Sequence, residues 1–403
     1  MYKKKILLLM IILCIKTDLL AEQVNNEKQI EQIFDMASKI EIKVVIKEGG
    51  RVDWCRKSNM IVYDRKGEDG YFDIYVSDKD TGEEKCLSCY NERLPGLNNG
   101  NPAWHPSCKF IAFQSQDPYL IAMVPGDLHR EKEQSAMRKG KPSNRLIPLE
   151  KTEMQKEFEK FVSSPAVGLS NNVWIMNSEG DNVWQITHIK EGMGVLNPHF
   201  SPDGSKLIWS EIVDVKRGSP PVWAIKIADV EINNEKFTIK NIQTLRPNNM
   251  QIYKTHGFSP DGKFILVSAS EKNKFYNKMA IYKMELKSGK VSLFQLTDSD
   301  SWNDLARFTP DGTNIVWLSS KDVPQPERKN YKDLFGNPPK LDYWIMNADG
   351  SNKRRLTFFN SESQNYNIFT ISDFEFINEE NTIISSFFPR DSLIESIALI
   401  RFK

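Results

Sequence analysis

The stretch Phe200-Ser201-Pro202-Asp203-Gly204, followed by the apolar run Leu207-Ile208-Trp209, decides the fold of this chain. It returns at 258–262 as Phe-Ser-Pro-Asp-Gly and at 308–312 as Phe-Thr-Pro-Asp-Gly. The aromatic residue ends one strand, proline sets φ near its value in a turn, aspartate can bond the local backbone, and glycine supplies positive φ. With the β-rich run that follows, the unit predicts a hairpin, and its recurrence predicts a repeat fold.

Weaker copies of the unit begin at Trp54, at Trp104 and at Phe374 or Phe376, which brings the count to six. Each of the first five units is followed by a second hairpin whose first strand is aromatic and β-rich, as at 173–176 and 343–346. Four antiparallel strands at a period of about 50 residues are typical of a propeller blade.

The sixth unit has only three strands before the chain ends, and an isolated strand is expected at 42–46. Combining both termini in one blade removes the open sheet edge that an unclosed ring would leave. We therefore predict an all-β fold over residues 41–403: a six-bladed β-propeller of four-stranded antiparallel blades, closed by an N-terminal strand that completes the last blade.

The N-terminus has the pattern of a secretory signal, with lysines at 3–5, an apolar run at 6–15 and a small residue at Ala21. The apolar run is too short to cross a bilayer as a helix. We expect a signal peptide at 1–21, a lead-in segment at 22–40, no transmembrane span in the mature chain, and a periplasmic or secreted protein. Lipidation at Cys14 and retention of the N-terminus as an anchor are the alternatives.

Composition excludes some partners. The chain is 40% hydrophobic and 27% charged, which is typical of a folded globular protein, and its formal net charge is only +1. A nucleic-acid binder would carry a strong basic excess. We therefore expect no nucleic-acid partner.

Four cysteines remain after removal of the signal, and all lie early in the chain: Cys55, Cys86, Cys89 and Cys108. An even number in an exported chain favours structural disulfides or buried thiols over a metal site or redox catalysis. The pairing is left open by the sequence.

The alternation of strands places the long connections on one face. The turns after the first and third strand of a blade are short, whereas the connections after the second strand and between blades are long. The largest is an insertion at 117–170, with a helical stretch at 150–161, and a second lies at 320–341. Because loops on rigid scaffolds carry function, we expect the binding surface on this face.

Polar residues near the innermost strands are the candidates for a ligand site at the mouth of the central channel on this face. They are Asn101, Asn197, His199, Thr255, His256 and Arg307. His199 and His256 are the candidate ligands if a metal is bound there. The alternative, which we favour, is that these groups bond to one another across blades. The chain has no nucleophile elbow, P-loop or His-Glu-x-x-His motif, so we predict neither catalytic residues nor a cofactor.

The repeats at 200–204, 258–262 and 308–312, with the segments 174–177 and 344–350, resemble the TolB-like six-bladed propellers with Pro-Asp-Gly repeats. That resemblance implies a periplasmic, protein-binding role. The leading hypothesis is an exported, non-enzymatic propeller that binds a protein or an envelope polymer through its long-loop face. A propeller enzyme acting on a saccharide with a metal at the channel mouth, which would resemble the oligogalacturonate-lyase type, is the alternative. A purely structural propeller in a larger assembly is a third hypothesis, and the oligomeric state is left open.

Overall fold

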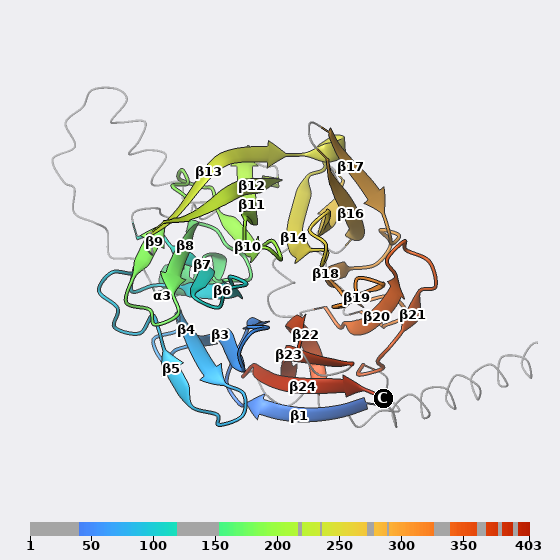
Figure 1. Ribbon diagram of the computed structural model, residues 1–403, viewed down its shortest axis with the longest axis horizontal. Coiled ribbons are helices and arrows are strands. Elements are labelled where there is room, and N and C mark those ends of the chain that lie inside the picture. Colours follow the sequence, from blue (N-terminus) through green and yellow to red (C-terminus); the bar gives the residue numbers. More distant parts are fainter. Residues whose placement is uncertain are drawn as a thin grey trace, which may run out of the picture.

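A computed structural model describes residues 40–118, 153–216, 220–233, 236–271, 278–287, 290–325, 339–360, 368–377, 381–389 and 394–403. In these residues six four-stranded antiparallel sheets stand around a common axis (Figure 1). The prediction of a six-bladed β-propeller is confirmed. The predicted signal peptide and nearly all of the lead-in segment lie outside the described residues.

The first three blades follow one another along the chain, and each runs from the axis outward. Blade 1 contains β2 (Val52–Trp54), β3 (Met60–Lys66), β4 (Phe72–Asp78) and β5 (Glu84–Cys86). Blade 2 contains β6 (Asn99–Trp104), β7 (Phe110–Gln116), β8 (Asn171–Asn177) and β9 (Val183–Gln185). Blade 3 contains β10 (Val195–Phe200), β11 (Lys206–Asp214), β12 (Val222–Asn233) and β13 (Lys236–Leu245).

The last three blades complete the ring. After the short 3₁₀ helix η1 (Pro247–Asn249), blade 4 contains β14 (Ile252–Phe258), β15 (Phe264–Ser270), β16 (Ala280–Lys287) and β17 (Lys290–Gln295). Blade 5 contains β18 (Asn303–Phe308), β19 (Asn314–Ser319), β20 (Asp342–Asn347) and β21 (Arg354–Arg355). Blade 6 contains β22 (Ile368–Phe376), β23 (Thr382–Pro389), β24 (Ser396–Phe402) and β1 (Ile40–Ile46).

The two ends of the chain close the ring in one sheet. Strand β1 pairs antiparallel with β24, from Ile40 opposite Phe402 to Ile46 opposite Ile397. Figure 1 shows the blue first strand beside the red last one. The closing strand begins at Ile40, slightly earlier than predicted, because Ile40 and Ile42 both pack against the apolar cluster between blades 5 and 6.

Apolar clusters fill the junctions between blades. Ile61 and Tyr63 of blade 1 share a buried cluster with Ile384 and Ile397 of blade 6. Corresponding clusters join each of the other five pairs of neighbouring blades. Burying apolar surface on both sides of every sheet is the main stabilising contribution in such a ring.

The repeated turns form as their chemistry predicts. Asp203 Oδ1 accepts hydrogen bonds from Ser201 Oγ at 2.6 Å and from the Ser205 backbone N–H at 3.0 Å. Gly204 has φ of 75°, in the left-handed region that glycine adopts without strain. The turns at 259–263 and 309–313 repeat these bonds.

The insertion of blade 2 leaves and re-enters the sheet at neighbouring residues, since the Asp117 N–H donates to Ser170 O at 2.8 Å. Residues 119–152 lie outside the described part. The predicted helix is present as α3 (Glu153–Val162). No helix in the described part of the chain is long and apolar enough to cross a membrane.

Candidate functional site

The innermost strands share an irregularity that shapes the polar groups around the axis. The register of β10 with β11 shifts between Leu196 and His199, and similar shifts occur in the innermost strands of blades 2, 4, 5 and 6. At the equivalent position Asn101, Asn197 and Leu305 have φ of 54°, 51° and 49°. Asparagine tolerates this left-handed conformation better than most residues. The bulge therefore favours Asn at two of these positions.

Three of the predicted residues form one buried network through blades 2, 3 and 4. Asn101 Nδ2 donates to Asn197 Oδ1 at 2.7 Å and to Gln114 Oε1 at 2.6 Å. Asn197 Nδ2 donates to Thr255 O at 3.2 Å, and Thr255 Oγ1 donates to Asn197 O at 2.7 Å. These amides and the hydroxyl group hydrogen-bond to one another. This favours the interpretation that they connect neighbouring blades over the interpretation that they bind a ligand.

A polar residue near the end of the second strand supports this network in most blades. It recurs at one register position as Asp64, Gln114, Ser210, Ser268 and Ser386, whereas blade 5 has Leu318 there. Four of these residues reach the first strand of the next blade. Asp64 accepts from Asn101 N at 2.8 Å, Gln114 from Asn197 N at 3.0 Å and Ser210 from Thr255 N at 2.9 Å, while Ser268 donates to Asn303 O at 3.0 Å.

Arg307 makes the corresponding connection from blade 5. Its Nη1 donates to His256 O in blade 4 at 2.7 Å. On the other side Nη2 lies 3.2 Å from Asp373 Oδ1, and Nε lies 3.1 Å from Glu375 Oε2, both in blade 6. The arginine side chain is only 8% exposed. Burial raises the pKa of Asp373 to about 6, although Arg307 opposes the shift.

Asp53 adds a further carboxyl group to this side of the ring. Its two oxygens accept hydrogen bonds from the Trp54 N–H at 2.8 Å and from the Trp104 N–H at 2.6 Å. Burial, with a contribution from Glu375, raises the pKa of Asp53 to about 7. The acidic groups Asp53, Asp373 and Glu375 thus lie near Arg307, and Glu375 also lies 3.6 Å from Arg56.

His256 lies in a buried group with Ser268 and Asp304. Its Nε2 lies 2.6 Å from Ser268 Oγ and 3.2 Å from Asp304 Oδ1. Lys254 Nζ lies 2.5 Å from Asp304 Oδ2. Burial lowers the pKa of His256 to about 4, so the imidazole is neutral at pH 7. The Ser268 hydroxyl and the Asp304 carboxylate contact the same nitrogen of the His256 ring. In a Ser-His-Asp triad the hydroxyl and the carboxylate contact different ring nitrogens, so this group does not have the geometry of a triad.

His199 is half-buried and lies on β10, the innermost strand of blade 3, whereas His256 lies on β14, the innermost strand of blade 4. Burial, Arg307 and His256 together hold its pKa well below the ordinary value. Among the described residues, no group of three His, Cys, Asp or Glu side chains that includes either histidine has all its ligand atoms within 4.8 Å of one another. The two predicted metal ligands therefore do not form a closed ligand set by themselves.

Two more acids lie where the ring closes, the buried Asp64 and the half-buried Glu395, and sequence reasoning missed them. Ser372 Oγ donates to Glu395 Oε1, and Arg51 Nη1 lies 3.7 Å from Asp64 Oδ2. Burial raises the pKa of Asp64, and it raises that of Glu395 to about 8. A Cβ on Gly50 would collide with Asp64, so the glycine lets the backbone approach this carboxylate.

The six predicted residues thus fall into different settings. Asn101, Asn197 and Thr255 belong to one network, Arg307 to an ion cluster and His256 to a buried group with Ser268 and Asp304, while His199 lies near Arg307 and His256. The residues that the prediction omitted include Lys254, Asp304, Glu375 and Glu395. The polar residues on the second strands could have been found in the sequence. Each of them directly follows an apolar triplet, at 61–63, 111–113, 207–209 and 265–267.

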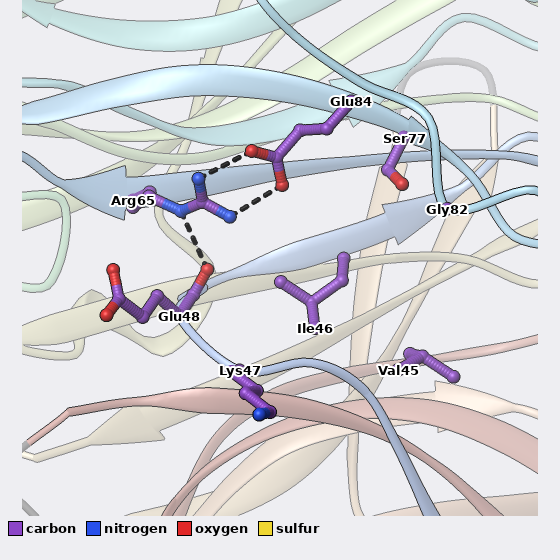
Figure 2. A pocket seen from close by; sticks show the side chains of 8 residues that line it. All are labelled: Val45, Ile46, Lys47, Glu48, Arg65, Ser77, Gly82 and Glu84. Carbon is purple, nitrogen blue, oxygen red and sulfur yellow. Dashed lines mark hydrogen bonds and ion pairs between the residues drawn. The ribbon is translucent and has the colours of Figure 1, made fainter.

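A surface pocket of about 300 Å³ lies away from the axis, beside β1 and blade 1. Figure 2 shows that Arg65 binds both carboxylate oxygens of Glu84, each at 2.6 Å, and donates from Nε to Glu48 O at 2.8 Å. None of the predicted residues lines it. The remaining lining residues are Val45, Ile46, Lys47, Ser77 and Gly82.

The four cysteines form two disulfides. Cys55 is joined to Cys108, which links blades 1 and 2, and Cys86 is joined to Cys89 within a single turn. The second pair lies where β5 ends, beside Asp73.

No family model matches the chain, and no curated protein matches it. Solved structures that it resembles include a putative TolB from Agrobacterium tumefaciens, with a TM-score of 0.47, 15% identity, and 79% of this chain and 87% of that chain covered. TolB from Acinetobacter baumannii gives a TM-score of 0.46 and 14% identity over 87% of this chain and 67% of that chain.

An oligogalacturonate lyase from Vibrio parahaemolyticus gives a TM-score of 0.46 and 10% identity over 90% of this chain and 95% of that chain. TolB proteins are thus among the solved structures that the chain resembles.

Proposed function

We propose that the chain is an exported, non-enzymatic propeller that binds a protein or an envelope polymer through its long-loop face. The observation that carries this proposal is the rigid base of the blade 2 insertion on that face. The polar groups around the axis support it indirectly, because most of them are engaged with one another.

The base of the insertion is held by hydrogen bonds, of which those of Ser163 with Asn98 and Asn171 are buried. Asn98 Nδ2, in the connection between blades 1 and 2, donates to Ser163 Oγ and to Lys160 O, each at 2.9 Å. Asn171 Nδ2 donates to Ser163 O at 2.9 Å. Lys160 Nζ donates to Asp69 O in blade 1 at 2.8 Å. Helix α3 is therefore held by two blades, and an ordered base of this kind suits a loop that presents a binding surface.

The test is removal of the insertion's tip with its base kept. We expect a variant in which a short Gly-Ser linker replaces residues 122–150 to fold normally, because α3 and its partners remain. It should lose capture of its partner from an extract of the native envelope. Lys263→Glu, an exposed change in a short turn of the opposite face, is the control and should leave capture intact. Unchanged capture by the deletion variant would contradict the proposal.

The proposed export rests on the signal-like residues 1–21 and on the two disulfides, which persist in oxidising compartments. We expect the mature chain in the periplasmic or secreted fraction with a new N-terminus after Ala21. N-terminal sequencing of the fractionated protein checks this. A full-length chain in the cytosol would argue against it.

A metal-dependent enzyme acting on a saccharide is the second candidate. The observation in its favour is that burial keeps His199 and His256 neutral, which is the form that binds metals. If it is correct, purified protein contains a divalent metal, and His199→Ala with His256→Ala removes it. Metal content that does not change in the double variant would exclude these two ligands.

A further inference from the structure

The Cys86–Cys89 disulfide stands at a half-exposed site on the outer side of blade 1. Both cysteines are partly exposed, and the next residue, Tyr90, is fully exposed. The intervening Leu87 is buried against the turn at Gly180 of blade 2. The turn is therefore anchored by its centre, while its two sulfur-bearing residues reach the surface.

The surroundings of the two sulfur atoms suit a thiolate as well as a disulfide. The Cys89 backbone N–H donates to Cys86 Sγ at 3.0 Å. A donor in this position stabilises a negative charge on that sulfur. The Tyr75 hydroxyl lies 3.4 Å from Cys89 Sγ, and a carboxylate oxygen of Asp73 lies within 4.8 Å of both sulfur atoms.

Asp73 is held in place by its neighbours. Ser88 Oγ donates to Asp73 Oδ1 at 2.6 Å and accepts from the Ile74 N–H at 2.8 Å. Burial, assisted by the nearby charge of Asp69, raises the pKa of Asp73, whereas Ser88 lowers it. A carboxyl group in this setting can exchange a proton with a sulfur nearby.

The other disulfide has a different environment. Cys55 is 1% exposed, whereas Cys108 is partly exposed and packs against the apolar cluster between blades 1 and 2. Among the described residues, no carboxylate makes a comparable group with these two sulfur atoms. One disulfide thus has a buried cysteine in an apolar setting, and the other has two half-exposed cysteines beside a carboxylate.

We propose that Cys86 and Cys89 form a redox-exchangeable pair that accepts two electrons from a dithiol of a partner protein, with Asp73 as its proton-transfer group. A thiolate of the partner attacks Cys89 Sγ, and the Cys86–Cys89 bond breaks with its electron pair on Cys86. The partner's second thiol loses its proton and attacks the partner's own sulfur in the mixed disulfide, which releases Cys89. The partner becomes a disulfide, and Cys86 and Cys89 become thiols after taking up two protons.

The test measures each disulfide separately in the full-length protein. The protein is incubated with dithiothreitol, quenched with acid, alkylated and analysed by peptide mass spectrometry. We expect Cys86 and Cys89 to be reduced at least about tenfold faster than Cys55 and Cys108, with an unchanged circular dichroism spectrum. Equal rates, or reduction of Cys86 and Cys89 only together with unfolding, would overturn the proposal.

Asp73→Asn tests the proton-transfer group, because asparagine can still accept the Ser88 hydrogen bond. We expect about a tenfold slower reduction of this pair at pH 7 and loss of one inflection from the rate–pH profile. The charged groups that bear on the site include Asp69, beside Asp73, and Arg65, which lies 4.5 Å above the Tyr75 ring and is paired with Glu84. Asp80→Asn, an exposed change in the same blade, is the control. A profile for Asp73→Asn that coincides with the control's would refute the role of Asp73.

Discussion

Replacing Arg307 with methionine removes a cation that, in the described part of the chain, connects blade 5 to the carboxylates of blade 6 around the axis. In the native protein this side chain lies 3.2 Å from Asp373 and 3.1 Å from Glu375, and donates to His256 O at 2.7 Å. Methionine keeps most of the apolar volume, so little of the effect comes from a cavity. The variant therefore isolates the loss of the buried charge.

The expected cost follows from burial. The side chains of Arg307 and Asp373 are 8% and 9% exposed, so solvent screens their interaction little. Removing one partner of a buried ion pair costs about 3–5 kcal/mol, because the other charge is left without compensation. Burial already raises the pKa of Asp373 to about 6, and without Arg307 it rises further. The loss should therefore grow as the pH rises above about 6 and Asp373 must ionise unpaired.

Urea unfolding at pH 5 and pH 8 measures this loss. The exposed Arg354→Met is the matched control and should change the free energy of unfolding by less than about 0.5 kcal/mol. Adding Asp373→Asn and Glu375→Gln to Arg307→Met should restore most of the stability, since uncharged groups need no counter-ion. The reasoning is refuted if Arg307→Met costs less than about 1 kcal/mol, or if the neutral substitutions restore nothing.

Two further predictions concern the ring closure and the disulfides. Burial raises the native pKa of Glu395 from its ordinary 4.5 to about 8. The stability that the protonated carboxyl group contributes is therefore fully present below about pH 4.5 and is lost as the pH rises through about 8. Glu395→Gln should flatten the decline of the urea midpoint between pH 5 and pH 8, and an equal decline in both proteins would contradict this. Replacing Cys55 and Cys108 with serine should cost about 4 kcal/mol and replacing Cys86 and Cys89 about 2 kcal/mol, because a closed loop constrains the unfolded chain more when it is longer. Equal unfolding free energies of the two double variants under oxidising conditions would count against this explanation.

The blades themselves could be predicted because their signals are local. In a turn such as 201–205, Ser, Pro, Asp and Gly act on a few neighbouring torsions, and the strands pair within the next residues. The closing strand was predicted from an unpaired segment and an incomplete last blade. The helix of the insertion followed from its pattern of apolar and charged residues. The choice between Phe374 and Phe376 needed the strand register, which places Phe376 opposite Ile383 at the position that Trp54 has opposite Ile61.

The sequence by itself thus determined the number of blades, the order of their strands and the closure of the ring. Tertiary structure alone decided which polar groups meet. Arg307 binds carboxylates 66 and 68 residues away, and Cys55 joins Cys108 across a blade junction. Such contacts join residues far apart in the sequence on neighbouring blades, so they depend on how the blades pack against one another, which local sequence signals do not determine.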